Sequence, residues 1–348
     1  YYRVDAPVPG FHEGEGTRDW LVVNANGFRR AEDVELKKPE GTYRVFLLGG
    51  SAAHGISSAE PYPIRHIYME ETIDAQLEEM LRSTHPDKRI EVINAAVTGY
   101  QVFQHTAYLQ SELLDYDPDL VIFFDGANDH YTYNPDFRYM QDFRYQFWKE
   151  RMQQPSLAAL WMHFADWMSE YSGLFRGYMA WTLNNDALQR SKASDFLGSA
   201  TEPAEIIGLH RQVAKRQFLR NIATNLFLLQ RQGVKAILCL QPELTLRDTT
   251  LLTAEEKNYL RVDRDIMLLY PEVIRELDSV AAPFAVPVID MNKPFNHPSY
   301  RDQTLLIDYC HLSPLGGEVV ARELLPLVER MMMGEEVAND SGAVAVPL

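Results

Sequence analysis

Hydrophobic positions along the chain gather in five short runs that are rich in β-branched residues. Within each run the apolar residues are consecutive rather than alternate, which is typical of strands buried on both faces of a parallel sheet. The runs are Tyr43–Leu48, Ile90–Ile93, Leu120–Phe124, Val234–Leu240 and Val286–Ile289. The pattern therefore predicts a five-stranded parallel sheet.

Helical patterns lie between most of these runs. They cover Ile67–Leu81, Val102–Leu114, Ile206–Gln232, Ala254–Val280 and a last helix from Ser313 and Pro314 to Met333. Alternating strands and helices predict a three-layer α/β/α fold with right-handed crossovers. The active site of such a sheet lies beyond the carboxyl ends of its strands, so we expect catalytic residues directly after strands.

Three segments do not follow this rhythm. Residues 1–42 are rich in Gly, Pro and charge, and we expect an N-terminal extension packed on a main domain of residues 43–334. A stretch from about residue 131 to 205 interrupts that domain, and its part Tyr131–Trp181 holds four of the five tryptophans. It predicts a helical insertion with an aromatic core, which we expect to cap the active site. Residues 335–348 have the composition of a disordered tail.

Charge and composition limit the partners. The formal net charge of −16 disfavours a nucleic-acid partner, which would need clustered Lys and Arg. The sequence contains no run of about 18 apolar residues, so it predicts no membrane-spanning helix. Because the sequence begins at Tyr1 rather than at a methionine, we expect a processed or trimmed chain, from which a signal peptide or membrane anchor could have been removed upstream. This slightly favours a periplasmic or secreted location but leaves the compartment open. Cys239 and Cys310 are too few for a disulfide scaffold, and we expect buried free thiols.

Candidate chemistry follows the first three predicted strands. Ser51 comes after Gly49 and Gly50 at a strand-to-helix turn, where its hydroxyl would face the sheet edge. Gly99 follows the second strand, where its backbone N–H suits a donor to an oxyanion, and the Asn128 carboxamide follows the third. Each of these motifs alone is also typical of an ordinary turn.

A fourth motif lies between the last strand and the last helix. Asp308 precedes His311 by three residues there. A serine hydroxyl needs a base near neutral pH, which His311 would supply, and a carboxylate can orient the imidazole. A lone Asp-x-x-His is also compatible with a surface loop, but the joint order of the four motifs favours a catalytic arrangement.

In these four motifs the chain resembles the SGNH (GDSL-like) hydrolase superfamily, whose blocks contribute Ser, Gly, Asn and His. The resemblance implies a flavodoxin-like sheet, a triad of Ser51, His311 and Asp308, and an oxyanion hole. The oxyanion hole would consist of the N–H groups of Ser51 and Gly99 and the side chain of Asn128. Two positions depart from the family pattern: Gly50 stands where many members have Asp, and Leu312 follows the histidine in place of the usual proline.

The resemblance implies a serine ester hydrolase that acts through an acyl-enzyme, without a cofactor. It implies carbohydrate O-acetyl esters or short to medium acyl esters as substrates. One alternative is an O-acyltransferase that uses the same triad on a glycan acceptor. The other is a non-catalytic binding module, which the occupied catalytic positions disfavour.

Five further residues are candidate substrate contacts, because they lie close to the motifs or follow a strand. They are His54, Tyr100, His130, Gln241 and Glu243. His54 is alternatively a second base or a turn residue, and Gln241 and Glu243 alternatively only end a strand. Asp125, Asp129 and His130 are potential metal ligands, but no second cluster has usable spacing, so we expect no metal.

Overall fold

The computed structural model of the protein describes residues 23–55, 67–130, 216–260 and 270–335, together with short pieces between 161 and 181. The chain divides into two units: residues 132–216 form one, and the remainder forms the other. The predicted tail at 335–348 lies outside the described residues except for its first position.

The larger unit contains a five-stranded parallel sheet, as the sequence predicts. Its strands are β1 (Thr42–Gly49), β2 (Arg89–Asn94), β3 (Leu120–Asp125), β4 (Lys235–Leu240) and β5 (Val288–Asp290). Their spatial order is β2-β1-β3-β4-β5, and every neighbouring pair is parallel. This is the order of the flavodoxin-like fold. The predicted fold class is confirmed.

Helices connect the strands. The described α-helices are α1 (Ser51–His54), α2 (Ile73–Thr84), α3 (Val102–Ser111), α4 (Ala127–His130), α10 (Arg216–Gln232), α11 (Ala254–Tyr259), α12 (Tyr270–Ala281), α13 (Asn292–Phe295) and α14 (Pro314–Met332). Short 3₁₀ turns are η1 (Met69–Glu71), η2 (Leu113–Tyr116), η5 (Leu244–Leu246), η6 (Ala282–Phe284) and η7 (Pro298–Tyr300). As expected, Ser313 caps α14, where its hydroxyl oxygen accepts the N–H of Gly316 at 3.0 Å.

Several element boundaries differ from the sequence prediction. The helix expected over Val102–Leu114 ends at Ser111, and of the helix expected over Ala254–Val280 the structure describes α11 and α12, with residues 261–269 outside the described part. Two further differences have a local cause. The helix expected from Ile67 begins only at Ile73, because Thr72 has an extended backbone and separates η1 from α2. The last strand begins at Val288 rather than Val286, since Pro287 has no N–H to donate to a sheet. This strand is half-exposed, as expected for a sheet edge, whereas β3 is buried along its whole length.

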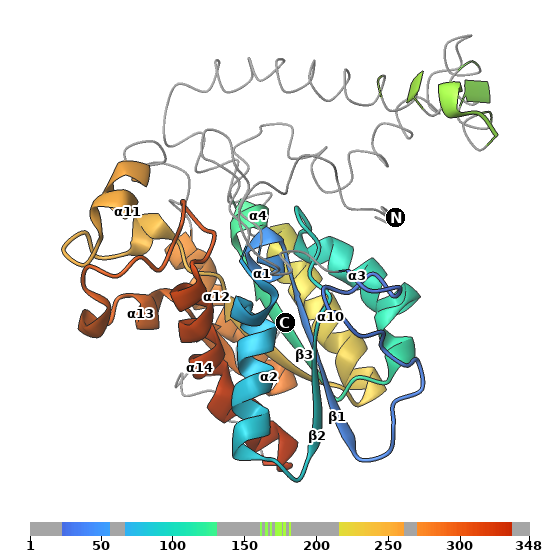
Figure 1. The fold of residues 1–348 in the computed structure, drawn as a ribbon, viewed down its shortest axis with the longest axis horizontal. Helices are drawn as coiled ribbons and strands as arrows, with labels where there is room; N and C mark the ends of the chain where they lie inside the picture. Colours follow the sequence, from blue (N-terminus) through green and yellow to red (C-terminus); the bar gives the residue numbers. More distant parts are fainter. Residues whose placement is uncertain are drawn as a thin grey trace. The chain divides into compact units, whose positions relative to one another are not determined.

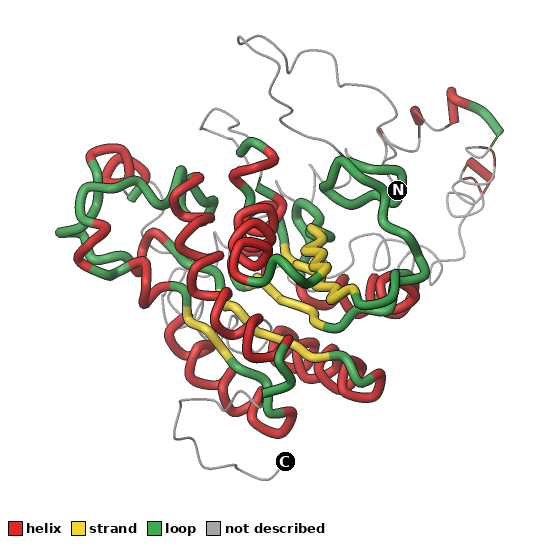
Figure 2. Tube along the Cα trace, turned by 60° about the horizontal axis from the view of Figure 1, so that its bottom comes forward, coloured by secondary structure: helices red, strands yellow, loops and turns green. Residues whose placement is uncertain are grey.

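The helices cover both faces of the sheet (Figures 1 and 2). Alternate residues of β1 show the two faces: Val45 and Leu47 pack with α2 and α14, whereas Phe46 and Leu48 pack with α3, α10 and α12. This alternation follows from the two-residue period of a strand. The result is the predicted three-layer α/β/α arrangement, and the sheet's carboxyl edge is left to the connecting loops.

The described part of the N-terminal segment contributes to the core. Phe28 is completely buried and contacts the rings of Phe46 and Tyr116, at centroid distances of 5.5 and 5.2 Å. Arg29 is buried beside it and donates to the backbone carbonyls of His54 and Ile67. The segment therefore packs on the domain through Phe28 and Arg29, while the predicted boundary at residue 42 stays a prediction.

The described residues of the smaller unit include an aromatic cluster. Trp161 lies 5.6 Å from Phe164 and 6.3 Å from Phe175 between ring centroids, and its indole N–H donates to the hydroxyl of Tyr178 at 3.1 Å. Most of the predicted insertion at 131–205 lies outside the described residues. The hypothesis that it caps the active site stays a prediction.

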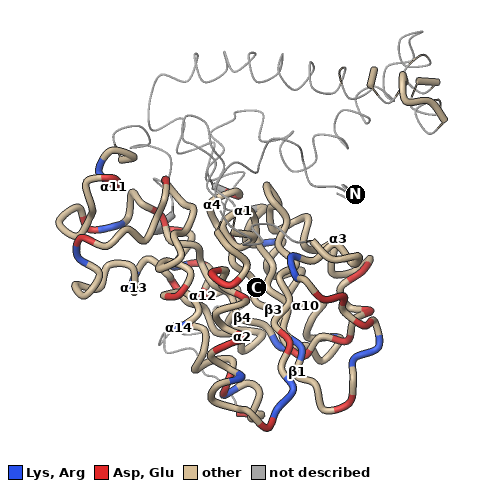
Figure 3. The backbone as a smooth tube through the Cα atoms, in the orientation of Figure 1, with Lys and Arg blue, Asp and Glu red and all other residues tan. Residues whose placement is uncertain are grey.

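Charged residues of both signs are interspersed along the described backbone (Figure 3). Surface pairs such as Arg322 with Glu318 bring opposite charges within 2.6 Å. Cys239 and Cys310 are buried and free, which confirms the sequence prediction. None of the helices that the structure describes is long and apolar enough to cross a membrane.

Candidate active site

Ser51 lies at the turn between β1 and α1, as predicted. Gly49 is required there, since a Cβ at this position would lie 2.5 Å from the carbonyl oxygen of Phe124 and 2.6 Å from the Cβ of Ala53. The turn therefore packs closely against β3 and α1, and this packing fixes the position of the first residue of α1. Ser51 is that residue, and it is 7% exposed.

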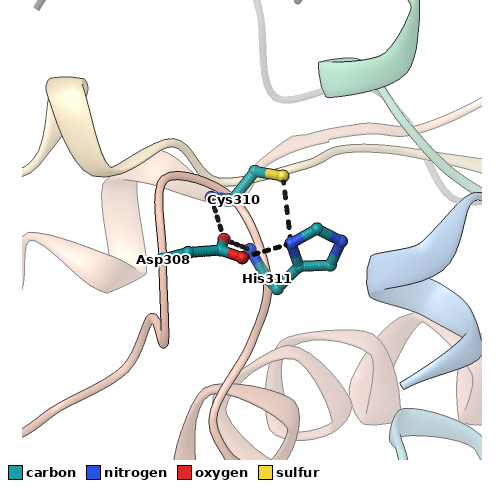
Figure 4. Close-up of side chains that lie close together, drawn as sticks. All are labelled: Asp308, Cys310 and His311. Carbon is teal, nitrogen blue, oxygen red and sulfur yellow. Dashed lines mark hydrogen bonds and ion pairs between the residues drawn. The ribbon is translucent and has the colours of Figure 1, made fainter. Parts of the chain in front are cut away.

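Ser51, His311 and Asp308 are joined by short hydrogen bonds. Oγ of Ser51 lies 2.6 Å from Nε2 of His311, and Nδ1 of His311 lies 2.7 Å from Oδ2 of Asp308. The other carboxylate oxygen of Asp308 accepts the backbone N–H groups of Cys310 and His311 at 2.9 and 2.8 Å. The carboxylate therefore fixes both the loop and the imidazole, as Figure 4 shows. A base next to a serine, oriented by a third group, is the arrangement that activates a hydroxyl nucleophile.

The loop that carries His311 is anchored from several directions. Leu306 and Leu312 pair across it as an antiparallel bridge. The segment after β4 also binds it: Nε2 of Gln241 donates to the carbonyl of Cys310 at 2.9 Å, and the N–H of Leu244 donates to that of Tyr309 at 2.8 Å. These contacts are made to the backbone of the loop, so they hold the histidine in place without depending on its own side chain.

Cys310 completes a group of three potential metal ligands with Asp308 and His311, whose ligand atoms lie within 4.8 Å of one another (Figure 4). Burial first, and then the charges of Asp308 and Glu243, raise the pKa of the Cys310 thiol well above its usual range. A thiol must lose its proton to bind a metal, and Nδ1 of His311 is already bonded to Asp308. The donor set therefore suits an acid–base pair better than a metal.

Asn128, one of the predicted oxyanion donors, lies next to Gly50. Nδ2 of Asn128 donates to the carbonyl of Tyr100 at 2.8 Å, and a Cβ on Gly50 would overlap this same nitrogen. An amide group carries two protons, so one remains for a ligand. Ser51 begins α1, where the first N–H groups of a helix have no partner within the helix.

Gly99 has the positive φ of 78° expected for a turn glycine, and a Cβ on it would meet no atom within 4 Å. An L-residue is strained at this φ, so glycine here serves the backbone conformation. The turn interpretation and the oxyanion interpretation are compatible, because a turn can also direct its N–H to a ligand.

The acidic residues near Asn128 are engaged in other contacts. Asp125 bonds the buried His105 through its Oδ1 and the ring Nε2, at 3.0 Å. Asp129 accepts the backbone N–H of Val102, at 3.3 Å to each carboxylate oxygen. Burial, and secondly the charge of Asp125, raise the pKa of Asp129 well above its usual range.

The five predicted substrate contacts occupy different environments. His54 and Tyr100 are half-buried near Ser51 and Asn128. Gln241 and Glu243 are buried, and Gln241 contacts the His311 loop. The backbone of His130 ends α4, while its side chain lies outside the described part of the structure. Their contact with substrate stays a prediction.

The sequence analysis missed Gln101 and His105. Gln101 donates from Nε2 to the backbone carbonyl of Asn128 at 2.7 Å, and its own N–H is accepted by Oε1 of Gln104 at 2.9 Å. A Gln at the third helical position that accepts the N–H of the residue before the helix is half of a recognisable capping pattern. Nothing in the sequence indicates that Gln101 reaches Asn128.

A linked serine, histidine and aspartate at the carboxyl edge of a flavodoxin-like sheet is the arrangement of a serine hydrolase that acts by acyl transfer. A sequence model of the GDSL-like lipase/acylhydrolase family matches residues 47–319, and the chain belongs to this family. The predicted resemblance is confirmed, and the protein is a carboxylic ester hydrolase. A search of curated proteins finds no match.

Solved structures similar to this chain include three esterases and hydrolases. The acetyl xylan esterase AlAXEase is 17% identical, with 82% of this chain and 99% of that chain covered and a TM-score of 0.44. LAE5, an alpha/beta hydrolase from the metagenome of Lake Arreo, is 14% identical, with 83% and 96% covered and a TM-score of 0.46. The acetylxylan esterase Axe2 from Geobacillus stearothermophilus is 14% identical, with 82% and 93% covered and a TM-score of 0.42.

Proposed function

We propose that the protein is a serine esterase that cleaves carbohydrate O-acetyl esters or short to medium acyl esters through an acyl-enzyme on Ser51. The observation that carries the proposal is the pair of short contacts from Ser51 to His311 and from His311 to Asp308. Membership of a lipase and acylhydrolase family supports an ester substrate.

In the first step, Nε2 of His311 takes the hydroxyl proton while Oγ of Ser51 bonds to the ester carbonyl carbon. Asp308 stabilises the imidazolium that forms. Collapse of the tetrahedral intermediate breaks the bond to the alcohol oxygen, which leaves with the proton from His311. Water then gives its proton to His311, attacks the acyl group and releases the acid, and the proton returns to Ser51.

The negative oxygen of each intermediate would be held by the N–H groups of Ser51 and Gly99 and by Nδ2 of Asn128. The position of Asn128 supports this assignment, because its Nδ2 lies against the backbone of Gly50, the residue before the nucleophile. Removing one such donor typically raises the barrier by about 2.7–4 kcal/mol.

A fluorophosphonate probe tests the nucleophile. We expect labelling of the wild type and of Ser83→Ala, whose serine is exposed on α2, but no labelling or turnover of Ser51→Ala. Turnover by a clean Ser51→Ala preparation would contradict the proposal.

The substrate class is tested by measuring turnover of p-nitrophenyl esters of increasing acyl length and of acetylated glycans, with and without a free sugar acceptor. Release of acetate or short acyl acids into water supports the proposed esterase. Transfer to the sugar without net hydrolysis would instead identify an acyltransferase.

A further inference from the structure

Gln101 lies at the junction of the loops that follow β2 and β3. It directly precedes α3 and comes two residues after Gly99, while its side chain reaches α4, the short helix that follows β3. Its Nε2 donates to the backbone carbonyl of Asn128 at 2.7 Å. A carbonyl can only accept, so this contact also fixes which end of the Gln101 amide faces Asn128.

Two neighbouring contacts join the same segments. The carbonyl of Tyr100 accepts Nδ2 of Asn128 at 2.8 Å, and the N–H of Val102 donates to the carboxylate of Asp129 at 3.3 Å. Three successive residues after Gly99 therefore bind two successive residues of α4. Gln101 is the one of the three that does so through its side chain to the backbone of Asn128.

Burial of the Gln101 side chain reduces the stability of the folded state. Gln101 is 6% exposed, and its Oε1 is buried without a hydrogen-bond partner among the described residues. A buried polar atom without a partner destabilises the folded state, whereas the bond from the other end of the amide satisfies the Asn128 carbonyl. The donor on the other end of the amide is what a glutamine supplies here.

We propose that Gln101 is a positioning residue of the oxyanion hole, which holds Asn128 so that its second Nδ2 proton faces the carbonyl under attack at Ser51. The inference rests on the proposed function of Asn128. Gln101 itself does not contact the substrate. Its loss lets the Asn128 backbone move, and a donor displaced by about 1 Å loses much of its effect on the transition state.

The test is a double-mutant cycle between Gln101→Met and Asn128→Ala. Methionine keeps the volume and removes the donor. We expect Gln101→Met to lower kcat about 10- to 100-fold at nearly unchanged KM, and Asn128→Ala to lower it about 10²- to 10³-fold. The double variant should match Asn128→Ala within about twofold, because Gln101 acts only through Asn128. Independent, multiplied losses would overturn the inference.

Gln104→Met is the matched control. It removes the bond from Gln101 N–H at the start of the same helix but leaves the contact with Asn128. We expect a lower Tm and an unchanged kcat. Equal losses of kcat in both variants would mean that only the helix start matters, and would also overturn the inference. Gln101→Glu, which places an acceptor against the Asn128 carbonyl, must reproduce the loss of kcat if Gln101→Met is poorly folded.

Ser51→Ala separates this inference from the proposed function. If Ser51→Ala is inactive but the losses of kcat from Gln101→Met and Asn128→Ala multiply in the double variant, only the proposed role of Gln101 is rejected. An active Ser51→Ala rejects the serine mechanism and the role of Gln101 with it.

Discussion

Oγ of Ser51 and Nε2 of His311 lie 2.6 Å apart, although 260 residues separate them along the chain. Ser51 follows β1, whereas the loop of His311 follows β5, and β3 and β4 lie between those strands in the sheet. Gln241 ties this loop to the end of β4. The alignment of nucleophile and base thus depends on several strands along the carboxyl edge of the sheet.

Because the two carboxylate oxygens of Asp308 have different partners, the effect of Asp308→Asn can be predicted. The remaining oxygen can still accept the backbone N–H groups of Cys310 and His311, so the loop should fold. The new NH2 group would face Nδ1 of His311 and favour the tautomer that carries its proton on Nε2. That tautomer cannot accept a proton from Ser51, so we expect kcat to fall about 10⁴-fold.

His311→Ala should be more damaging, by about 10⁶-fold, because it removes the base itself. Single-turnover kinetics on a p-nitrophenyl ester measure both losses, and circular dichroism checks the fold. An unchanged rate in Asp308→Asn would remove Asp308 from the proposed triad and leave Ser51 and His311 in it.

Gly50→Ala should impair catalysis without straining the backbone. Gly50 has φ −90° and ψ −150°, which any residue adopts, but a Cβ there would overlap Nδ2 of Asn128. The asparagine must move, and we expect a loss in kcat of about 10²- to 10³-fold, as for removal of an oxyanion donor.

Gly41→Ala is the matched control for that variant. Gly41 has φ 76° with no atom near the added Cβ, so alanine should lower the Tm and leave kcat unchanged. Wild-type kcat in Gly50→Ala would show that Asn128 moves freely or contributes nothing to the reaction.

The sequence predicted features that depend on local patterns. Consecutive apolar residues identified all five strands, and the residues directly after them included Ser51 and Asn128. The start of β5 was predicted two residues early, since Val286 continues the apolar run although Pro287 cannot donate to the sheet.

Contacts between separate loops could not be predicted from the sequence. Gln101 and Asn128 are 27 residues apart and follow different strands, so no periodicity relates them. Gln241 was predicted as a candidate substrate contact because it follows β4, and only the fold brings its amide to the carbonyl of Cys310. Such contacts depend on how far each loop reaches beyond its strand, which composition does not encode.

Gln241→Met should weaken the support of the His311 loop. It leaves the Cys310 carbonyl without this donor in a buried environment, which costs about 1–3 kcal/mol of unfolding free energy. Because the loop also loses its alignment, we expect kcat to fall more than KM changes. Gln76→Met removes comparable bonds to the carbonyls of Glu71 and Pro314 and serves as the control, with lower stability but unchanged kcat. Equal kcat in the two variants would contradict this role of Gln241.

Asp74 predicts a pH dependence of stability. It is buried, and its Oδ1 accepts Nδ2 of Asn94 at 2.7 Å, while the same nitrogen donates to the carbonyl of Ala53 at 2.9 Å. Burial raises the pKa of Asp74 from 3.8 to about 6, against the opposing effects of Asn94, Thr72 and Arg29.

The sign follows from proton binding. Between about pH 4 and pH 6 the folded state keeps a proton on Asp74 that the unfolded chain has lost, so the free energy of unfolding falls as the pH rises through this window. A difference of about two pKa units corresponds to roughly 3 kcal/mol. Asp74→Asn cannot ionise, yet its amide oxygen can still accept from Asn94. Urea unfolding of both proteins from about pH 4 to pH 8 should therefore show the variant gaining roughly 3 kcal/mol relative to the wild type as the pH increases. Other groups that titrate in this range cancel in the difference, so parallel curves would mean that Asp74 ionises in the folded protein as readily as in the unfolded chain.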